Sequence, residues 1–164
     1  MSVRLAVQIA CDRGVVPSAA LFSKWLNSAF DPQIRGEVGL RIVDTAEGAD
    51  LNRAYRGKDA ATNVLAFPCE DDFSAYESEP PLGDIVICAD VVVHEAQAQR
   101  KLPEAHWAHL TVHGALHLQG YDHETDTDAE RMETREREIM RKLGYPDPYE
   151  SLAPASAALQ DRQQ

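Results

Sequence analysis

Leu82-Gly-Asp-Ile-Val-Ile-Cys88 is the last strand-like segment of the chain, and the periodic segments that follow it are helical. Earlier in the chain, apolar residues alternate with other residues at 3–10 and 37–44, and a short apolar run covers 62–67. Helical patterns mark five segments, at about 18–30, 45–56, 89–100, 103–119 and 126–143. Strands gathered in the first half and helices in the second half predict an α+β domain built on one sheet.

The length of 164 residues fits one domain, which we place at 1–150, followed by a C-terminal tail at 151–164 that we expect to be flexible. The three cysteines are far apart and odd in number, which indicates a reducing compartment and no disulfide framework. No apolar run approaches the roughly 20 residues that span a bilayer, so we expect a cytoplasmic protein without a membrane partner. The formal charge of −11 disfavours a protein that coats nucleic acid non-specifically.

Histidines cluster in the segment His113-Gly-Ala-Leu-His117-Leu-Gln-Gly120-Tyr-Asp-His123. His113 and His117 are four residues apart, so on a helix they lie one turn apart on the same face, and their imidazoles can reach one metal ion. Gly120 can end that helix in a left-handed conformation, and the chain can then turn back to present His123 as a third ligand. Three neutral imidazoles leave one position open on a tetrahedral zinc ion, an arrangement typical of catalytic sites.

Two other histidines lie on the same stripe of this helix. His109 and His113 are also four residues apart, so the ligand pair can be shifted by one turn. We favour His113 and His117 because only that pair is followed by a turn glycine and a third histidine. We therefore expect His106 and His109 to line the pocket or to orient the ligands. Imidazole also binds nickel, copper and iron, so the spacing alone does not fix the metal.

The histidine spacing also matches that of the metzincin proteases, in which a glutamate follows the first histidine and acts as general base. Here that position is Gly114, which has no side chain to accept a proton. Met132 lies in a strongly helical stretch and gives little support for the Met-turn of those enzymes. The motif is therefore metzincin-like, but its chemistry argues against a protease.

Two further motifs accompany the histidine segment. They are Leu51-Asn-Arg-Ala-Tyr-Arg-Gly-Lys-Asp59 with Thr62-Asn-Val-Leu-Ala-Phe-Pro68, and Leu82-Gly-Asp-Ile-Val-Ile-Cys88. In content and order the three blocks resemble the YbeY family of bacterial endoribonucleases, over about residues 50–147. Ala66 stands where the family usually has serine. The resemblance implies a mixed sheet of about four strands packed against several helices, with the histidine motif on a central helix.

The resemblance also implies a function and its residues. One zinc ion would be held by His113, His117 and His123, and the arginine of the Tyr-Arg-Gly motif, Arg56, would be catalytic. The implied activity is cleavage of single-stranded RNA in the maturation of small-subunit ribosomal RNA, together with quality control of ribosomes. The expected partners are therefore ribosomal RNA and the ribosome or its proteins, and not DNA.

Zinc held by three imidazoles would lower the pKa of a bound water toward ~7 and would so supply hydroxide near neutral pH for attack on the phosphorus. In the alternative route, the ion would polarise the phosphodiester while a ribose 2′-hydroxyl attacks. Both routes place negative charge on the phosphoryl oxygens, and the guanidinium of Arg56 matches that charge with bidentate donors. By residue type alone, Arg56 would be a solvated charge that the dipole favours at a helix end.

Other charged residues near these motifs are candidates for supporting roles. Arg53 and Lys58 can extend a basic strip for the RNA backbone. Asp122 and Asp84 can orient histidine N–H groups, or they can fix the turns in which they lie. The mixed acidic and basic run from Asp126 to Glu138 is expected to be a solvated helix face with i, i+4 pairs.

Two other functions stay open at this point. A ribosome-assembly or RNA-binding factor with a structural metal would need no catalytic arginine. A metal-dependent hydrolase of another substrate would use the same three ligands for different chemistry.

Overall fold

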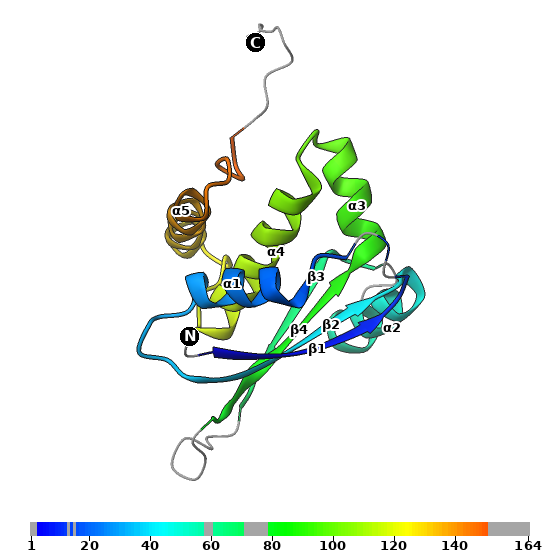
Figure 1. Cartoon of the computed structure of the whole chain (residues 1–164), viewed down its shortest axis with the longest axis horizontal. Helices are drawn as coiled ribbons and strands as arrows, with labels where there is room; N and C mark the ends of the chain where they lie inside the picture. Colours follow the sequence, from blue (N-terminus) through cyan, green and yellow to red (C-terminus); the bar gives the residue numbers. More distant parts are fainter. Residues whose placement is uncertain (1–2, 13, 15, 58–60, 71–78, 151–164) are drawn as a thin grey trace, which may run out of the picture.

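The computed structural model describes residues 3–12, 14, 16–57, 61–70 and 79–150 (Figure 1). The strands and helices in this part of the chain are, in order, β1 (Val3–Ala10), α1 (Ala19–Ala29), β2 (Gly36–Val43), α2 (Thr45–Arg56), β3 (Val64–Pro68), β4 (Pro81–Cys88), α3 (Ala89–Ala98), α4 (Pro103–Leu118) and α5 (Asp126–Leu143). Their bounds agree with the segments expected from sequence to within two residues. The expected tail, 151–164, lies outside the described residues.

Side chains that cap the helices explain where several of them begin and end. Ser18, Asp44 and Thr125 precede α1, α2 and α5, and each accepts a hydrogen bond from a backbone N–H in the first turn of its helix. Gly57 and Gly144 end α2 and α5 in the left-handed conformation, with φ of 70° and 91°.

The sheet has the strand order β1-β2-β4-β3. β1 and β2 are parallel, as are β2 and β4, whereas β3 runs antiparallel to β4 and forms one edge. This mixed sheet of four strands confirms the fold expected from sequence. Leu40 pairs with Ile85 and Ile42 with Ile87, and all four side chains are buried.

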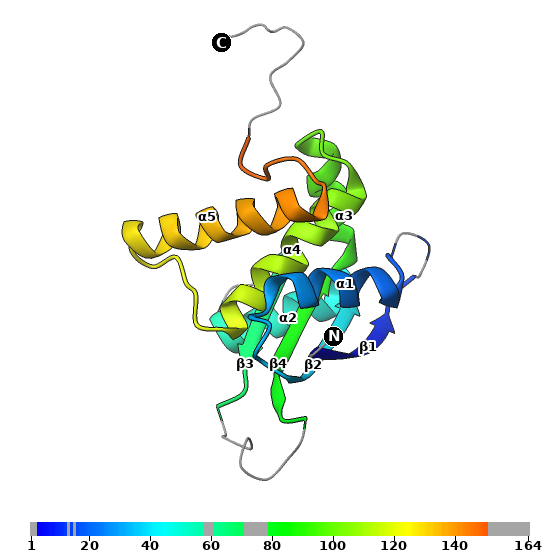
Figure 2. The same ribbon diagram turned by 60° about the vertical axis from the view of Figure 1, so that its left-hand side comes forward.

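Different helices cover the two faces of the sheet, and Figures 1 and 2 show α1 and α4 on one side and α2 on the other. On the α4 side, a Cβ at Gly114 would lie only 3.0 Å from the Ile85 side chain. On the α2 side, a Cβ at Gly48 would lie 3.4 Å from the Cys88 sulfur. Gly114 therefore lets α4 pack closely on β4, which is a structural reason for glycine at the position where metzincins carry glutamate.

The central helix, α4, is buried along most of its length. Figure 2 shows α5 packing across it, and Met132, Ile139 and Met140 of α5 join the same core as Trp107 and Leu116 of α4. Although α4 is largely apolar, neither it nor any other helix in the described ranges has the length and apolar character needed to cross a lipid bilayer. The packing fixes α4 in place and leaves the histidines at its C-terminal end partly exposed.

Candidate metal centre

Three histidines come together where α4 ends. The rings of His113 and His117 lie one helical turn apart, with centroids separated by 4.6 Å. Beyond α4, Gly120 (φ 97°) turns the chain so that the His123 ring lies 5.7 Å from His113 and 5.2 Å from His117. One ring nitrogen from each residue lies within 4.8 Å of those from the other two. The structure therefore brings together the three residues that the sequence singled out, in a group that could hold a metal ion.

The charge state of His117 suits a metal ligand. Burial, and then the neighbouring rings of His113 and His123, lower the pKa of His117 to about 4. A histidine ligates a metal through an unprotonated nitrogen, and His117 is therefore in its ligating form at neutral pH. His123 is exposed and the other two rings are half-buried, so the cluster is open to solvent on one side.

A fully buried carboxylate from α5 lies behind the cluster. Glu136 Oε2 accepts a hydrogen bond from His113 Nδ1 at 2.6 Å, and Oε1 accepts one from His109 Nε2 at 2.9 Å. Burial by itself raises the pKa of the Glu136 carboxyl, but the hydrogen bonds from His109 and His113 outweigh it and hold that pKa at about 2. Because His113 Nδ1 donates to Glu136, the Nε2 of His113 is directed to His117, whose Nε2 lies 3.1 Å away.

The expectation that the run from Asp126 to Glu138 is a solvated helix face is wrong at Glu136. Most of α5 is exposed or half-buried, but Met132, Glu136, Ile139 and Met140 form one buried stripe. Their successive separations of four, three and one residues follow a helical period, so a lone acidic residue stands within an apolar stripe. The position of Glu136 in this stripe could have indicated a functional contact, because a carboxylate buried among apolar residues needs hydrogen-bond partners.

A second group of ligand atoms overlaps the first. His109, His113 and Glu136 also place one ligating atom each within 4.8 Å of one another, which corresponds to the one-turn shift that the sequence left open. Here both rings are already hydrogen-bonded to the carboxylate, and His109 and Glu136 are buried. His106 is buried as well, and it pairs with Glu95 at 2.9 Å rather than with this group. The group formed by residues 113, 117 and 123 is thus the more exposed of the two.

The two candidate aspartates lie in different places. Asp122 precedes His123, and its carboxylate accepts a hydrogen bond from the backbone N–H of Glu124 at 3.1 Å, as expected of a turn residue. Asp84 is exposed in the middle of β4, and it alternates with Ile85, whose side chain faces α4. The Asp84 side chain therefore points to the opposite face of the sheet, and the structure does not bring it to the histidines.

The arginine singled out from sequence ends α2, which covers the face of the sheet opposite α4. Arg56 is the exposed last residue of α2, and the ring of its neighbour Tyr55 lies 4.8 Å from that of Phe67 in β3. β3 also packs against α4, so this strand adjoins both the helix that carries Arg56 and the helix that carries the histidines. Arg53 forms an ion pair within α2 at 3.0 Å, and Lys58 lies outside the described residues.

The fold and the cluster define a class of protein, an α+β domain with a candidate three-histidine metal site at the end of its central helix. Residues 15–144 match the sequence model of the family described as Endoribonuclease YbeY. The chain belongs to this family. That finding confirms the resemblance drawn from the three sequence blocks and, at the level of the family, the expectation of an endoribonuclease, a hydrolase that acts on RNA.

Bacterial proteins named Endoribonuclease YbeY are similar to the chain over most of its length. The protein of Nitrosomonas europaea is 53% identical over 145 residues, which cover 88% of this chain and 84% of that protein. Those of Xanthomonas euvesicatoria and Nitrosococcus oceani are 53% and 46% identical over 88% and 93% of this chain, and over 92% and 100% of their own lengths. The solution structure of a Thermotoga maritima protein, 24% identical, matches 90% of this chain and 99% of that one with a TM-score of 0.53, which supports the fold alone.

Proposed function

We propose that this protein is a zinc-dependent endoribonuclease that cleaves single-stranded RNA, and that it acts in the maturation of small-subunit ribosomal RNA and in ribosome quality control. The observation that carries the proposal is the solvent-open cluster of His113, His117 and His123, whose ligating nitrogens lie within 4.8 Å of one another in a chain of the endoribonuclease YbeY family. A cytoplasmic location follows from the proposed substrate. The proposed partners are ribosomal RNA and ribosomal proteins.

The donor set fits zinc. Three imidazoles form the ligand set of zinc sites that keep one position free for a substrate or water. When bound, the ion supplies Lewis acidity that polarises a phosphodiester or activates a water molecule. His113, His117 and His123 would hold it, and Glu136 would keep the His113 ring oriented through the hydrogen bond to Nδ1.

Arg56 is the residue that we propose for the phosphate. A guanidinium stays protonated throughout the reaction, and it can donate two parallel hydrogen bonds to the phosphoryl oxygens as their negative charge grows. The exposed end of α2 leaves this side chain accessible to RNA, whereas Arg53 is engaged in an ion pair. We propose weaker backbone contacts for Arg53 and Lys58. Because the whole chain carries a charge of −11, delivery of the RNA would depend on a ribosomal partner more than on general attraction.

Metal removal tests the proposed function. We expect chelator-treated protein to lose cleavage of a single-stranded fragment of small-subunit ribosomal RNA, and one equivalent of zinc to restore it, because the ion supplies the Lewis acid. Cleavage rates of the untreated, metal-free and zinc-restored protein are compared on the same RNA. Undiminished cleavage by the metal-free protein would contradict the proposal. Zinc binding without any RNA cleavage, even with ribosomes present, would favour the assembly-factor alternative.

A further inference from the structure

Tyr149 follows α5 in the chain and contacts Glu136, the buried carboxylate behind the histidine cluster. Its hydroxyl donates a hydrogen bond to Glu136 Oε1. Its ring stands edge-on against His109, with centroids 5.4 Å apart, and the guanidinium of Arg137 lies 5.3 Å from the ring centroid. Tyr149 therefore contacts the carboxylate and one of the two histidines that share it.

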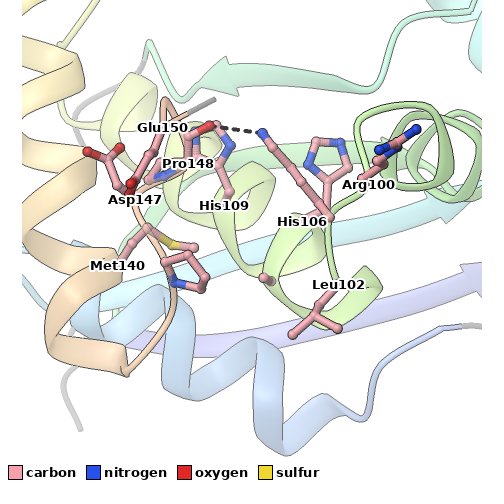
Figure 3. Close-up of a pocket in the computed structure, with 11 residues that line it drawn as sticks. Arg100, Leu102, His106, His109, Met140, Asp147, Pro148 and Glu150 are labelled. Atoms are coloured by element: carbon pink, nitrogen blue, oxygen red, sulfur yellow. Dashed lines mark hydrogen bonds between the residues drawn. The ribbon is translucent and has the colours of Figure 1, made fainter. Parts of the chain in front are cut away.

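The segment that carries Tyr149 is fixed to the rest of the protein. Lys101 Nζ donates a hydrogen bond to the backbone oxygen of Pro148 at 2.9 Å, and Pro148 is buried. Arg137 pairs with Asp147 at 3.3 Å, and Asp147 Oδ1 accepts the backbone N–H of Tyr149 at 2.8 Å. Asp147 and Pro148 line a cavity of about 260 Å³ together with His106 and His109 of α4 (Figure 3). The contacts of Pro148 and Asp147 thus hold the segment that places Tyr149 against Glu136.

The hydrogen bonds of Glu136 connect Tyr149 to the proposed metal site. Oε1 accepts from His109 and Tyr149, and Oε2 accepts from His113. Because the carboxylate is fully buried, these three donors fix its orientation. Burial and the adjacent carboxylate raise the pKa of the Tyr149 hydroxyl, so it keeps the proton that it donates.

We infer that Tyr149 is a positioning residue for the metal centre, which acts through Glu136 to hold His113 Nε2 in its ligating direction. The inference rests on the proposed metal site, because orienting His113 Nε2 matters only if that nitrogen binds a metal ion. It extends the site to a hydroxyl whose hydrogen bond is made to Glu136 and not to His113, His117 or His123. Outer groups that orient metal-binding histidines contribute to metal affinity as well as to activity, so affinity is the quantity to measure.

Tyr149→Phe keeps the ring and removes the hydroxyl. We expect this variant to bind zinc about tenfold more weakly than the wild type, in line with the usual cost of losing an outer partner of a metal site. Zinc dissociation constants are measured by competition with a chromophoric chelator. Tyr145→Phe is the matched control, because Tyr145 also donates to a carboxylate, Glu104 Oε2 at 2.6 Å, away from the histidine cluster. The control is expected to bind zinc as the wild type does.

A double-mutant cycle tests whether Tyr149 acts through Glu136. Glu136→Gln is expected to weaken zinc binding about 10- to 100-fold, because an amide offers one acceptor oxygen where the carboxylate offers two. Adding Tyr149→Phe to Glu136→Gln is expected to change affinity less than twofold further. Glu95→Gln is the control for Glu136→Gln, since Glu95 also accepts a hydrogen bond from a histidine, His106.

The outcomes separate this inference from the proposed function. If the wild type binds zinc tightly and His117→Ala does not, the site is supported. Given that site, a Tyr149→Phe affinity within twofold of the wild type overturns the inference, and so do fully additive effects in the cycle. If the wild type itself binds no zinc, the proposed function fails first. A purely structural role for the hydroxyl would lower thermal stability in Tyr149→Phe and leave zinc affinity unchanged.

Discussion

His117→Ala is expected to lower kcat/KM for RNA cleavage by at least about a thousandfold. His117 supplies one of three imidazoles, and its lowered pKa keeps it in the ligating form at neutral pH. A bound metal contributes several kcal/mol to the stabilisation of the transition state, and each 1.4 kcal/mol is roughly a factor of ten in rate. Loss of the proposed ligand would remove the ion, and with it that contribution. Cleavage of a single-stranded ribosomal RNA fragment and bound zinc per chain are measured on the same preparations.

His94→Ala is the matched control for this experiment. His94 is exposed on α3 and belongs to neither group of ligand atoms, so its loss should leave both cleavage and zinc content as in the wild type. A contaminating nuclease from the expression host would give equal activity in the wild type and in both variants. Full activity in His117→Ala, with zinc still bound, would contradict the assignment of His117.

Arg56→Ala is expected to lower kcat/KM about 100-fold while zinc content stays at the wild-type level. The guanidinium is proposed to stabilise charge that grows on the phosphoryl oxygens, and removal of one such donor costs about 10²- to 10³-fold. The effect should fall mainly on kcat, because the charge is greatest in the transition state. Initial rates over a range of RNA concentrations separate kcat from KM.

Arg141→Ala controls for the loss of one positive charge near a helix end. Arg141 is exposed in the last turn of α5, as Arg56 is in the last turn of α2. The control should cleave RNA at the wild-type rate. Equal rates for Arg56→Ala and the wild type would exclude Arg56 from the reaction. A change confined to KM would make Arg56 a residue for RNA binding only.

Local patterns were sufficient to predict the elements of this fold. Alternating apolar residues in β1 and β2, and helical spacing in α1, predicted their bounds closely because each segment buries one face. The histidine pair could be placed for the same reason, since a separation of four residues fixes one face of a helix. Gly120 supplied the turn that carries His123 back.

The features that could not be predicted from sequence depend on contacts between segments that lie far apart in the chain. The apolar stripe of α5 signals that Glu136 is buried, but its partners His109 and His113 follow only from the packing of α5 on α4. Tyr149 meets Glu136 through a return of the chain after α5, which no periodic pattern encodes. The side of β4 on which Asp84 points likewise depends on which face of the sheet α4 covers.

The position of the metal tests the central claim most directly. Anomalous diffraction at the zinc edge, from crystals of the zinc-loaded protein, locates the ion without assumptions about its ligands. We predict one ion at about 2.0–2.1 Å from a ring nitrogen of each of His113, His117 and His123. An ion bound instead between His109, His113 and Glu136, or away from all three predicted ligands, would contradict the account.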